Sequence, residues 1–411
     1  SSRRSLTLHV WNMGILFFIV IFGCVDWQIW SRLTLRHEGV WGKYRMEKRM
    51  TVSISIFNNK GGVGKTTSIW NLAVSLSEKG KEILVIDFDP QCNFSIAALG
   101  SDIFESCLKS TSENPLGTTV RSFVLPLVQQ SQKGNIYISE PKYKKGKKFD
   151  IIPGDFWLNR FSDILNVGTD VIGGSGLYRF LTPSLIADEA KKHSEKEYDY
   201  VLIDLPPSFN SIVRSSLYSS DYFIVPCTPD RFSGYCLSLI GEVLPNFTDD
   251  WQQGLKRYKQ TNPTDAYIID KGCPKFGGWI FNGFDTRRGK KLGADQAQFE
   301  QVKKAVQNDL ICKIKDKIEH YESVPDFVSI NPIAEIEDMN VMAPDSLQQN
   351  VPIKYLQNER PTRENYSKQQ WAWNQKELMG KIDKEYDKIA NYMSLLQNSS
   401  RNRVVDAAPR D

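Results

Sequence analysis

Short apolar runs recur along this chain, and segments with helical periodicity separate most of them. The run at 82–87 is apolar without polar alternation, which predicts a strand buried on both faces. Further strands are predicted at 52–57, 149–152, 198–204, 222–226 and 279–285. Apolar positions at helical spacing predict helices at 68–80, 120–132, 232–244, 299–314 and 366–396. This alternation predicts an α/β fold with a doubly wound, mostly parallel sheet, helical insertions and a C-terminal helix.

A glycine-rich loop, NKGGVGKTT at 59–67, joins the first predicted strand to the first predicted helix. Its glycines allow successive backbone N–H groups to turn inward, and the helix N-terminus adds partial positive charge. Lys65 supplies a full charge for the β- and γ-phosphates of a nucleotide, and Thr66 supplies a hydroxyl for Mg²⁺. A chance glycine turn is the competing interpretation, which the agreement of strand, loop and helix disfavours. The sequence therefore predicts a phosphate-binding loop.

Three carboxylates follow predicted strands. Asp87 and Asp89 stand at the end of the second strand, and Asp204 ends the run at 198–204. Acids at strand ends often only cap helices or face solvent. In an open α/β sheet, however, ligands bind at the carboxyl ends of the strands, where the phosphate-binding loop also lies. We therefore expect Asp204 to act as a Walker B carboxylate that holds Mg²⁺ through water.

These three stretches together resemble the ParA/MinD class of P-loop ATPases, and the ParA partitioning branch most closely. KGGVGKTT at 60–67 resembles the deviant Walker A box, although Asn59 replaces the first glycine of the ordinary pattern. The sequence DFDPQ at 87–91 is similar to switch I, and DLPP at 204–207 is similar to switch II. The family usually has glycine where this chain has Cys92, a difference that we interpret as neutral. The resemblance implies a P-loop NTPase fold of the SIMIBI type.

The resemblance also implies roles for individual residues. ATP and Mg²⁺ would be the cofactors, and Lys60 would reach across a homodimer to the partner's nucleotide. Asp89 would orient the attacking water, and Asp87 would support the water shell of Mg²⁺. Asn282, at the end of a predicted strand, would contact the purine, although such an Asn is often only a turn residue. The loop residues expected to hold the nucleotide are Gly61, Gly62, Val63, Gly64, Lys65, Thr66 and Thr67.

The charge distribution limits any argument for nucleic-acid binding. The formal net charge is +4, but residues 1–49 hold eight Lys/Arg and three Asp/Glu, so the remainder is close to neutral. The segment 287–317 is locally basic, with nine Lys/Arg and four Asp/Glu. Its helix could bind DNA phosphates without sequence preference, or it could simply be solvated. The candidate DNA contacts are Arg287, Arg288, Lys290, Lys291, Lys303 and Lys304.

The N-terminal 49 residues allow two interpretations. Residues 5–25 carry no acidic or basic side chain other than His9, and could form a membrane anchor. We favour the view that 1–49 is an extension from upstream translation and that the working protein starts near Met50. The expected organisation is an ATPase domain at 50–345, with insertions near 100–148 and 249–274. A helical segment at 346–398 and a disordered tail at 399–411 would follow.

The sequence thus predicts a dimeric ATPase that drives partitioning or positioning of DNA with a ParB-like activating partner. It would be cytoplasmic, and associated with the nucleoid if it binds DNA. The main alternative is a MinD-like positioning or assembly ATPase that acts at a membrane without DNA binding. A membrane-tethered tyrosine kinase would share the Walker boxes, but the chain lacks a tyrosine-rich tail. An iron–sulfur reductase would need paired cysteines, and the seven cysteines include no C-x-x-C.

Overall fold

The computed structural model describes residues 51–166, 170–321, 330–362 and 370–406, with side chains up to residue 398. Contacts within the chain separate two compact units, 1–49 and 50–411, and only the second contains described residues. The segment 5–25, for which a membrane anchor was the less favoured interpretation, therefore lies outside the described residues. Within the described ranges, no helix is both long and apolar enough to cross a membrane.

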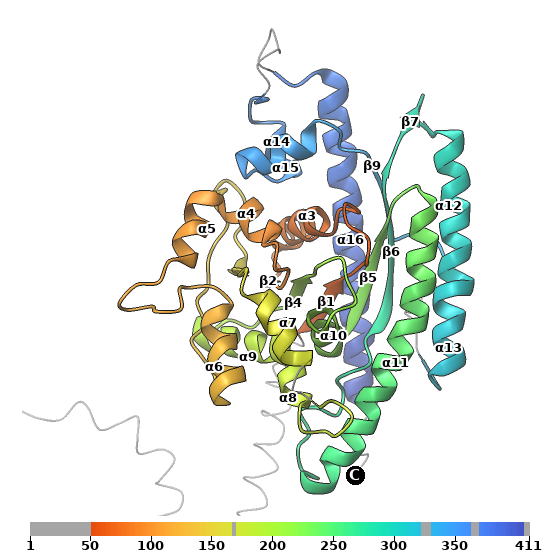
Figure 1. The fold of residues 1–411 in the computed structure, drawn as a ribbon. Coiled ribbons are helices and arrows are strands. Elements are labelled where there is room, and N and C mark those ends of the chain that lie inside the picture. Colours follow the sequence, from red (N-terminus) through yellow and green to blue (C-terminus); the bar gives the residue numbers. More distant parts are fainter. Residues whose placement is uncertain (1–50, 167–169, 322–329, 363–369, 407–411) are drawn as a thin grey trace, which may run out of the picture. The chain divides into compact units, whose positions relative to one another are not determined.

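A seven-stranded sheet forms the centre of the second unit, and all of its neighbouring strands pair in parallel (Figure 1). The strand order is β3-β2-β4-β1-β5-β6-β9, so strands lie on both sides of β1, as the doubly wound prediction requires, with β4 inserted between β1 and β2. The strands are β1 (Val52–Ile56), β2 (Ile83–Asp87), β3 (Asp150–Ile152), β4 (Tyr200–Asp204), β5 (Tyr222–Cys227), β6 (Lys275–Phe284) and β9 (Ala334–Glu337). The edge strand β9 was not predicted, because only its alternate residues are buried and its four residues give a short pattern.

Helices cover both faces of the sheet. Helix α3 packs against the C-terminal helix α16, which also lies along β1 and β9. Helix α10 packs against β1, and α7, α8 and α9 pack against α10. The helices are α3 (Lys65–Glu78), α4 (Asn93–Leu99), α5 (Ser101–Leu108), α6 (Arg121–Gln130), α7 (Leu158–Asn166), α8 (Leu177–Phe180), α9 (Thr182–Ser194), α10 (Ser211–Ser219), α11 (Arg231–Thr261), α12 (Gly293–Ala305), the π-helical η1 (Val306–Cys312), α13 (Lys313–Lys317), α14 (Met342–Gln349), α15 (Ile353–Leu356) and α16 (Trp373–Asp406).

Helix α11 is much longer than the sequence indicated. The helix predicted at 232–244 continues through Pro245 to Thr261, so half of the stretch interpreted as an insertion at 249–274 is its last turns. Proline removes one helical hydrogen bond, which is why it normally predicts a helix end. Here the buried face continues past it through Thr248, Trp251 and Leu255. Packing of this face outweighs the local cost of the proline.

The two other amphipathic predictions agree with the structure. The apolar positions from Phe299 to Ile314 are buried along α12, η1 and α13, which pack on α11. In α16, apolar residues from Met379 to Met393 are buried in the core. The predicted tail at 399–411 overlaps the last turns of α16, and 407–411 lie outside the described residues.

Candidate nucleotide site

The loop between β1 and α3 has the backbone geometry of an anion cradle. Gly62 and Gly64 have positive φ angles of 74° and 80°, which glycine adopts without steric cost. Gly64 is the N-cap of α3 and offers no side chain to cap it, so the first-turn N–H groups have no side-chain acceptor from the cap. Helix N-termini of this kind bind phosphate. The residues present therefore fit the phosphates of a nucleotide.

Lys65 and Thr66 begin α3 and face carboxylates from neighbouring strand ends. The Lys65 ammonium donates a hydrogen bond to the carbonyl oxygen of Lys60 at 2.9 Å. Burial lowers the pKa of Lys65, and the nearby charges of Asp204 and Asp89 raise it. The Thr66 hydroxyl donates to Asp204 Oδ2 at 2.8 Å. The predicted magnesium residues Thr66 and Asp204 therefore lie in direct contact.

Strand register explains why the carboxylates gather here. Asp87 and Asp204 are paired positions at the ends of the adjacent strands β2 and β4. Both are fully buried, and burial raises the pKa of Asp204 well above its usual range, with the neighbouring Asp87 adding to the rise. Two acids side by side at low exposure are unfavourable unless a cation or a proton neutralises them. This donor set suits Mg²⁺, which prefers oxygen ligands.

Asp87 makes additional contacts that the sequence did not predict. Its Oδ2 accepts hydrogen bonds from the Ser95 amide at 2.8 Å and from the Ser95 hydroxyl at 2.6 Å. Burial raises the pKa of Asp87 and outweighs the opposing Ser95 hydrogen bonds, so that the pKa is about 7. Asp87 thereby ties β2 to the first turn of α4. Its predicted support of the Mg²⁺ water shell stays a prediction.

Asp89 lies next to the cradle and is also buried, with 4% of its surface exposed. Its Oδ1 accepts the Gln91 amide at 2.9 Å, which fixes the turn after β2. Burial raises the pKa of this carboxyl, and the charge of Lys65 lowers it. The loop ends at Cys92, whose φ of 54° lies in the left-handed region. This conformation gives a physical reason why glycine is usual at that position.

Lys60 does not point into its own cradle. Its ammonium donates to Thr228 Oγ1 at 2.9 Å and forms an ion pair with Asp230, on the loop between β5 and α11. Asp230 also caps α11 by accepting the amides of Phe232 and Ser233 at 2.9 and 3.1 Å. Although partial burial raises the pKa of Asp230, its hydrogen bonds from Lys60 and Thr228 bring it below its usual value. No sequence motif indicates this partner, which is 170 residues away.

Asn282 lies against the cradle at the end region of β6. Its side-chain amide donates to the carbonyl oxygen of Val63 at 2.9 Å. A Cβ atom on Gly64 would approach the Asn282 amide nitrogen to 2.2 Å, so any larger residue would displace the Asn282 side chain in addition to straining the positive φ angle. The contact with the loop is therefore established, whereas the predicted contact with a purine stays a prediction.

Switch II also touches the cradle. Pro207 lies beside Gly61, since a Cβ on Gly61 would be 4.0 Å from Pro207 Cγ. The ring of Phe209 meets that of Phe57 edge to face, with centroids 5.3 Å apart. Helix α10 begins directly afterwards, capped by the Asn210 side chain. A movement of the Pro206–Pro207 turn would therefore act on the loop and on α10 together.

The cradle and both switches lie in a region that a known protein family shares. The model of the family AAA_31, described as an AAA domain, matches residues 51–257, which is half of the chain. The chain belongs to this AAA-domain family. The matched range includes the cradle, both switches and most of α11, but not Asn282. Together with the relatives named as ParA family proteins, it confirms the resemblance to ParA/MinD-type ATPases.

Relatives of the AAA-domain chain support the same assignment. An uncharacterized protein of Methanocaldococcus jannaschii is 35% identical over 182 residues, which cover 44% of this chain and 61% of that protein. A ParA family protein of Mycoplasma genitalium is 30% identical over 201 residues, or 48% of this chain and 65% of the relative. The chain thus spans less than two thirds of the length of these two relatives.

Solved structures show the same fold. A Corynebacterium diphtheriae protein superposes with a TM-score of 0.56 at 21% identity, covering 74% of this chain and 98% of that one. The pnob8 ParA gives a TM-score of 0.51 at 18% identity, covering 83% of this chain and 99% of the other. The α/β fold predicted for this AAA-domain chain is therefore confirmed.

The predicted DNA contacts fall into two groups. Arg287, Arg288 and Lys290 are exposed on the small hairpin of β7 (Thr286–Arg287) and β8 (Lys290–Lys291). Lys291 instead forms an ion pair with Glu335, and its ammonium lies 4.5 Å from the centroid of the Phe299 ring. Helix α12 carries the last two, of which Lys303 donates to Asn331 Oδ1 at 2.9 Å and Lys304 is exposed. Lys291 and Lys303 therefore contact residues of their own chain, whereas the other four cations are exposed.

Proposed function

We propose that this chain is an ATP-dependent dimeric switch of the ParA type, which hydrolyses ATP to ADP and phosphate. The observation that carries the proposal is the convergence of Lys65, Thr66, Asp89 and Asp204 at one glycine cradle, on the carboxyl ends of β1, β2 and β4. Membership of the AAA-domain family supports it.

The residues of the cradle suit phosphoryl transfer, in which positioning and charge neutralisation supply most of the catalysis. Bound Mg²⁺ would neutralise the β- and γ-phosphate oxygens. Lys65 would stabilise the charge that develops on the γ-phosphate, and Thr66 and Asp204 would hold the metal. Asp89, fixed by the Gln91 amide, would accept a hydrogen bond from the attacking water and orient it.

Dimer formation would bring Lys60 to the partner's nucleotide. For this the Lys60 ammonium has to leave Asp230 and Thr228 of its own chain. Two large aromatic side chains stand exposed beside this ion pair at the start of α11, Phe232 at 53% and Tyr235 at 64%. Exposed aromatic residues next to a functional site are typical of protein interfaces. We therefore place Phe232 and Tyr235 in the dimer interface.

The dimer would act on DNA, with hydrolysis triggered by a ParB-like partner. The exposed cations Arg287, Arg288 and Lys290 at the β7–β8 hairpin support non-specific contact with phosphates. Relatives whose names place them in the ParA family favour partitioning or positioning as the biological role. The protein would then lie in the cytoplasm and associate with the nucleoid when ATP is bound.

Co-sedimentation of the full chain with random-sequence DNA, with and without Mg·ATP and across a salt series, tests the proposal. We expect binding only with ATP, and binding that weakens steeply with salt. Equal binding with and without ATP would reject the switch. If the chain instead sediments with anionic liposomes in an ATP-dependent way and ignores DNA, the MinD-like alternative replaces the partitioning role.

A further inference from the structure

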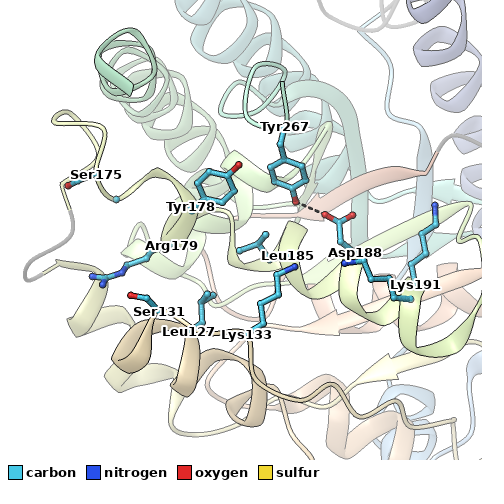
Figure 2. Close-up of a pocket in the computed structure, with 12 residues that line it drawn as sticks. Leu127, Ser131, Lys133, Ser175, Tyr178, Arg179, Leu185, Asp188, Lys191 and Tyr267 are labelled. Atoms are coloured by element: carbon cyan, nitrogen blue, oxygen red, sulfur yellow. Dashed lines mark hydrogen bonds between the residues drawn. The ribbon is translucent and has the colours of Figure 1, made fainter. Parts of the chain in front are cut away.

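A second large pocket lies apart from the cradle and takes no part in the proposed function (Figure 2). Its volume is about 960 Å³, within the range of small-molecule sites. One wall comes from the end of α6 and the turn after it, with Leu127, Ser131 and Lys133. The opposite wall comes from α8, α9 and the loop that follows α11, and it carries Tyr178 and Tyr267.

The two tyrosines form a fixed aromatic surface. Their rings stack with an interplanar angle of 10° and centroids 5.8 Å apart. The Tyr178 hydroxyl donates to Asp265 Oδ2 and the Tyr267 hydroxyl donates to Asp188 Oδ2, each at 2.6 Å. Each ring is thus fixed at its hydroxyl end. Leu127 and Leu185 add apolar surface to the same pocket. A planar apolar group would find a preformed place to pack.

Cationic side chains outnumber acids in the pocket lining, although Lys191 forms an ion pair with Glu197 outside it. Four cationic side chains line it, and Asp188 is the one acid among the lining residues, with Oδ2 accepting the Tyr267 hydroxyl. The four are Lys133, Arg179, Lys191 and Lys192. Lys133 and Lys192 share one carboxylate oxygen of Glu189, at 3.3 and 3.5 Å, so a single acid faces two ammonium groups. The pocket therefore has cationic charge to offer an anion.

This pocket is remote from the nucleotide cradle. It adjoins a smaller cavity of about 210 Å³ that shares Asp188, Lys191 and Tyr267 with it and is also lined by Thr51 and Ser53. These residues stand at the start of β1, whereas the cradle follows its other end. A five-residue strand is about 17 Å long, so one ligand of nucleotide size could not fill both places.

We propose that this pocket is a second ligand site, for a small anion with a planar aromatic body, the chemistry of a nucleoside monophosphate. The aromatic body would pack beside Tyr178 and Tyr267, and the anionic group would bind Arg179 together with Lys133 or Lys192. Arginine suits this task because its planar guanidinium donates two parallel hydrogen bonds to one phosphate. The proposal stands independently of the ATPase mechanism.

Calorimetric titration of the full chain with adenosine 5′-monophosphate tests the site. We expect saturable binding that persists in Lys65→Ala, whose cradle is damaged, and in Arg160→Glu, an exposed arginine on α7 outside the pocket. Arg179→Glu and the double variant Lys133→Glu/Lys192→Glu should each weaken binding by at least about tenfold. Adenosine and inorganic phosphate, titrated separately, should each bind more weakly than the monophosphate.

Several results would overturn the proposal. Loss of binding in Lys65→Ala would show that the monophosphate binds in the cradle. Wild-type affinity in the Arg179 and Lys133/Lys192 variants would show that it does not bind in this pocket. No binding of the monophosphate, together with binding of a polyglutamate peptide, would make the pocket a peptide site instead. In the wild-type chain, the monophosphate should also protect Arg179 from phenylglyoxal, as read by mass spectrometry; unprotected Arg179 would contradict the assignment without relying on any variant.

Discussion

The cradle and the basic segment at 287–317 are both candidate binding regions in the sequence, but their charged side chains are arranged differently in the structure. At the cradle, residues from three strand ends converge, and Thr66 contacts Asp204 directly. In the basic segment the charges disperse: Lys291 packs on Phe299 and pairs with Glu335, and Lys313 pairs with Glu242. Position at a strand end therefore determines where a side chain lies, whereas membership of a charged run does not. The two regions should accordingly respond to substitution in different ways.

The largest effect is expected for Lys65→Ala. Removing this buried ammonium takes away the charge that faces the phosphates, and loss of one partner of a buried charge pair costs about 2–5 kcal/mol. Mg·ATP affinity, measured by calorimetric titration, should fall accordingly. Arg160→Ala, at an exposed position on α7, serves as the control and should bind ATP normally. Normal ATP affinity in Lys65→Ala would reject the cradle.

Asp89→Ala should affect turnover and leave nucleotide affinity largely intact. A residue that orients water or accepts its proton contributes about 10²- to 10⁴-fold to the rate. Phosphate release should therefore slow by that factor, and a long-lived ATP-bound dimer should accumulate. Steady-state phosphate release and light scattering measure the two effects. Hydrolysis at the wild-type rate would assign the water-orienting role to another residue.

Strand ends explain which parts of the site the sequence could predict. Asp204 follows from an apolar run that ends in a polar residue, and Lys65 follows from the glycine-rich loop after β1. Parallel pairing brings the ends of these strands together. The partner of Lys60 could not be predicted, because Asp230 lies 170 residues away in the sequence. The contact of Asp87 with Ser95 is local, eight residues apart, but it depends on the direction in which the chain turns from β2 into α4. The predicted helix at 232–244 was too short, because α11 continues past Pro245, where long-range packing overrides the local effect of proline. The second pocket combines three separate segments and has no motif.

Substitutions of the exposed cations in the basic segment should reduce DNA affinity in proportion to the number of cations removed. The triple variant Arg287→Ala/Arg288→Ala/Lys290→Ala should weaken binding to random DNA and lower the dependence of log affinity on log salt by about 0.9 for each phosphate that these side chains neutralise. ATP hydrolysis without DNA should be unchanged. Fluorescence anisotropy across a salt series measures the slope. An unchanged slope would remove the hairpin from the DNA surface.

Lys291→Ala provides the matched comparison within the same hairpin. Because Lys291 contacts Glu335 and the Phe284 and Phe299 rings, its loss should lower the free energy of unfolding by about 1–2 kcal/mol. DNA affinity should stay at the wild-type value. Chemical denaturation measures the first effect and anisotropy the second. Weaker DNA binding at wild-type stability would show that Lys291 faces DNA instead.

Lys60 provides the most direct test of the dimeric switch, because in this structure it is bound within its own chain. The decisive measurement is the mass in solution, by light scattering, of wild-type chain and Lys60→Ala in the presence of Mg²⁺ and the slowly hydrolysed analogue ATPγS. We predict that the wild type becomes a dimer, whereas Lys60→Ala binds the nucleotide and stays a monomer. A Lys60→Ala dimer of wild-type stability, or a wild type that stays monomeric, would contradict the account.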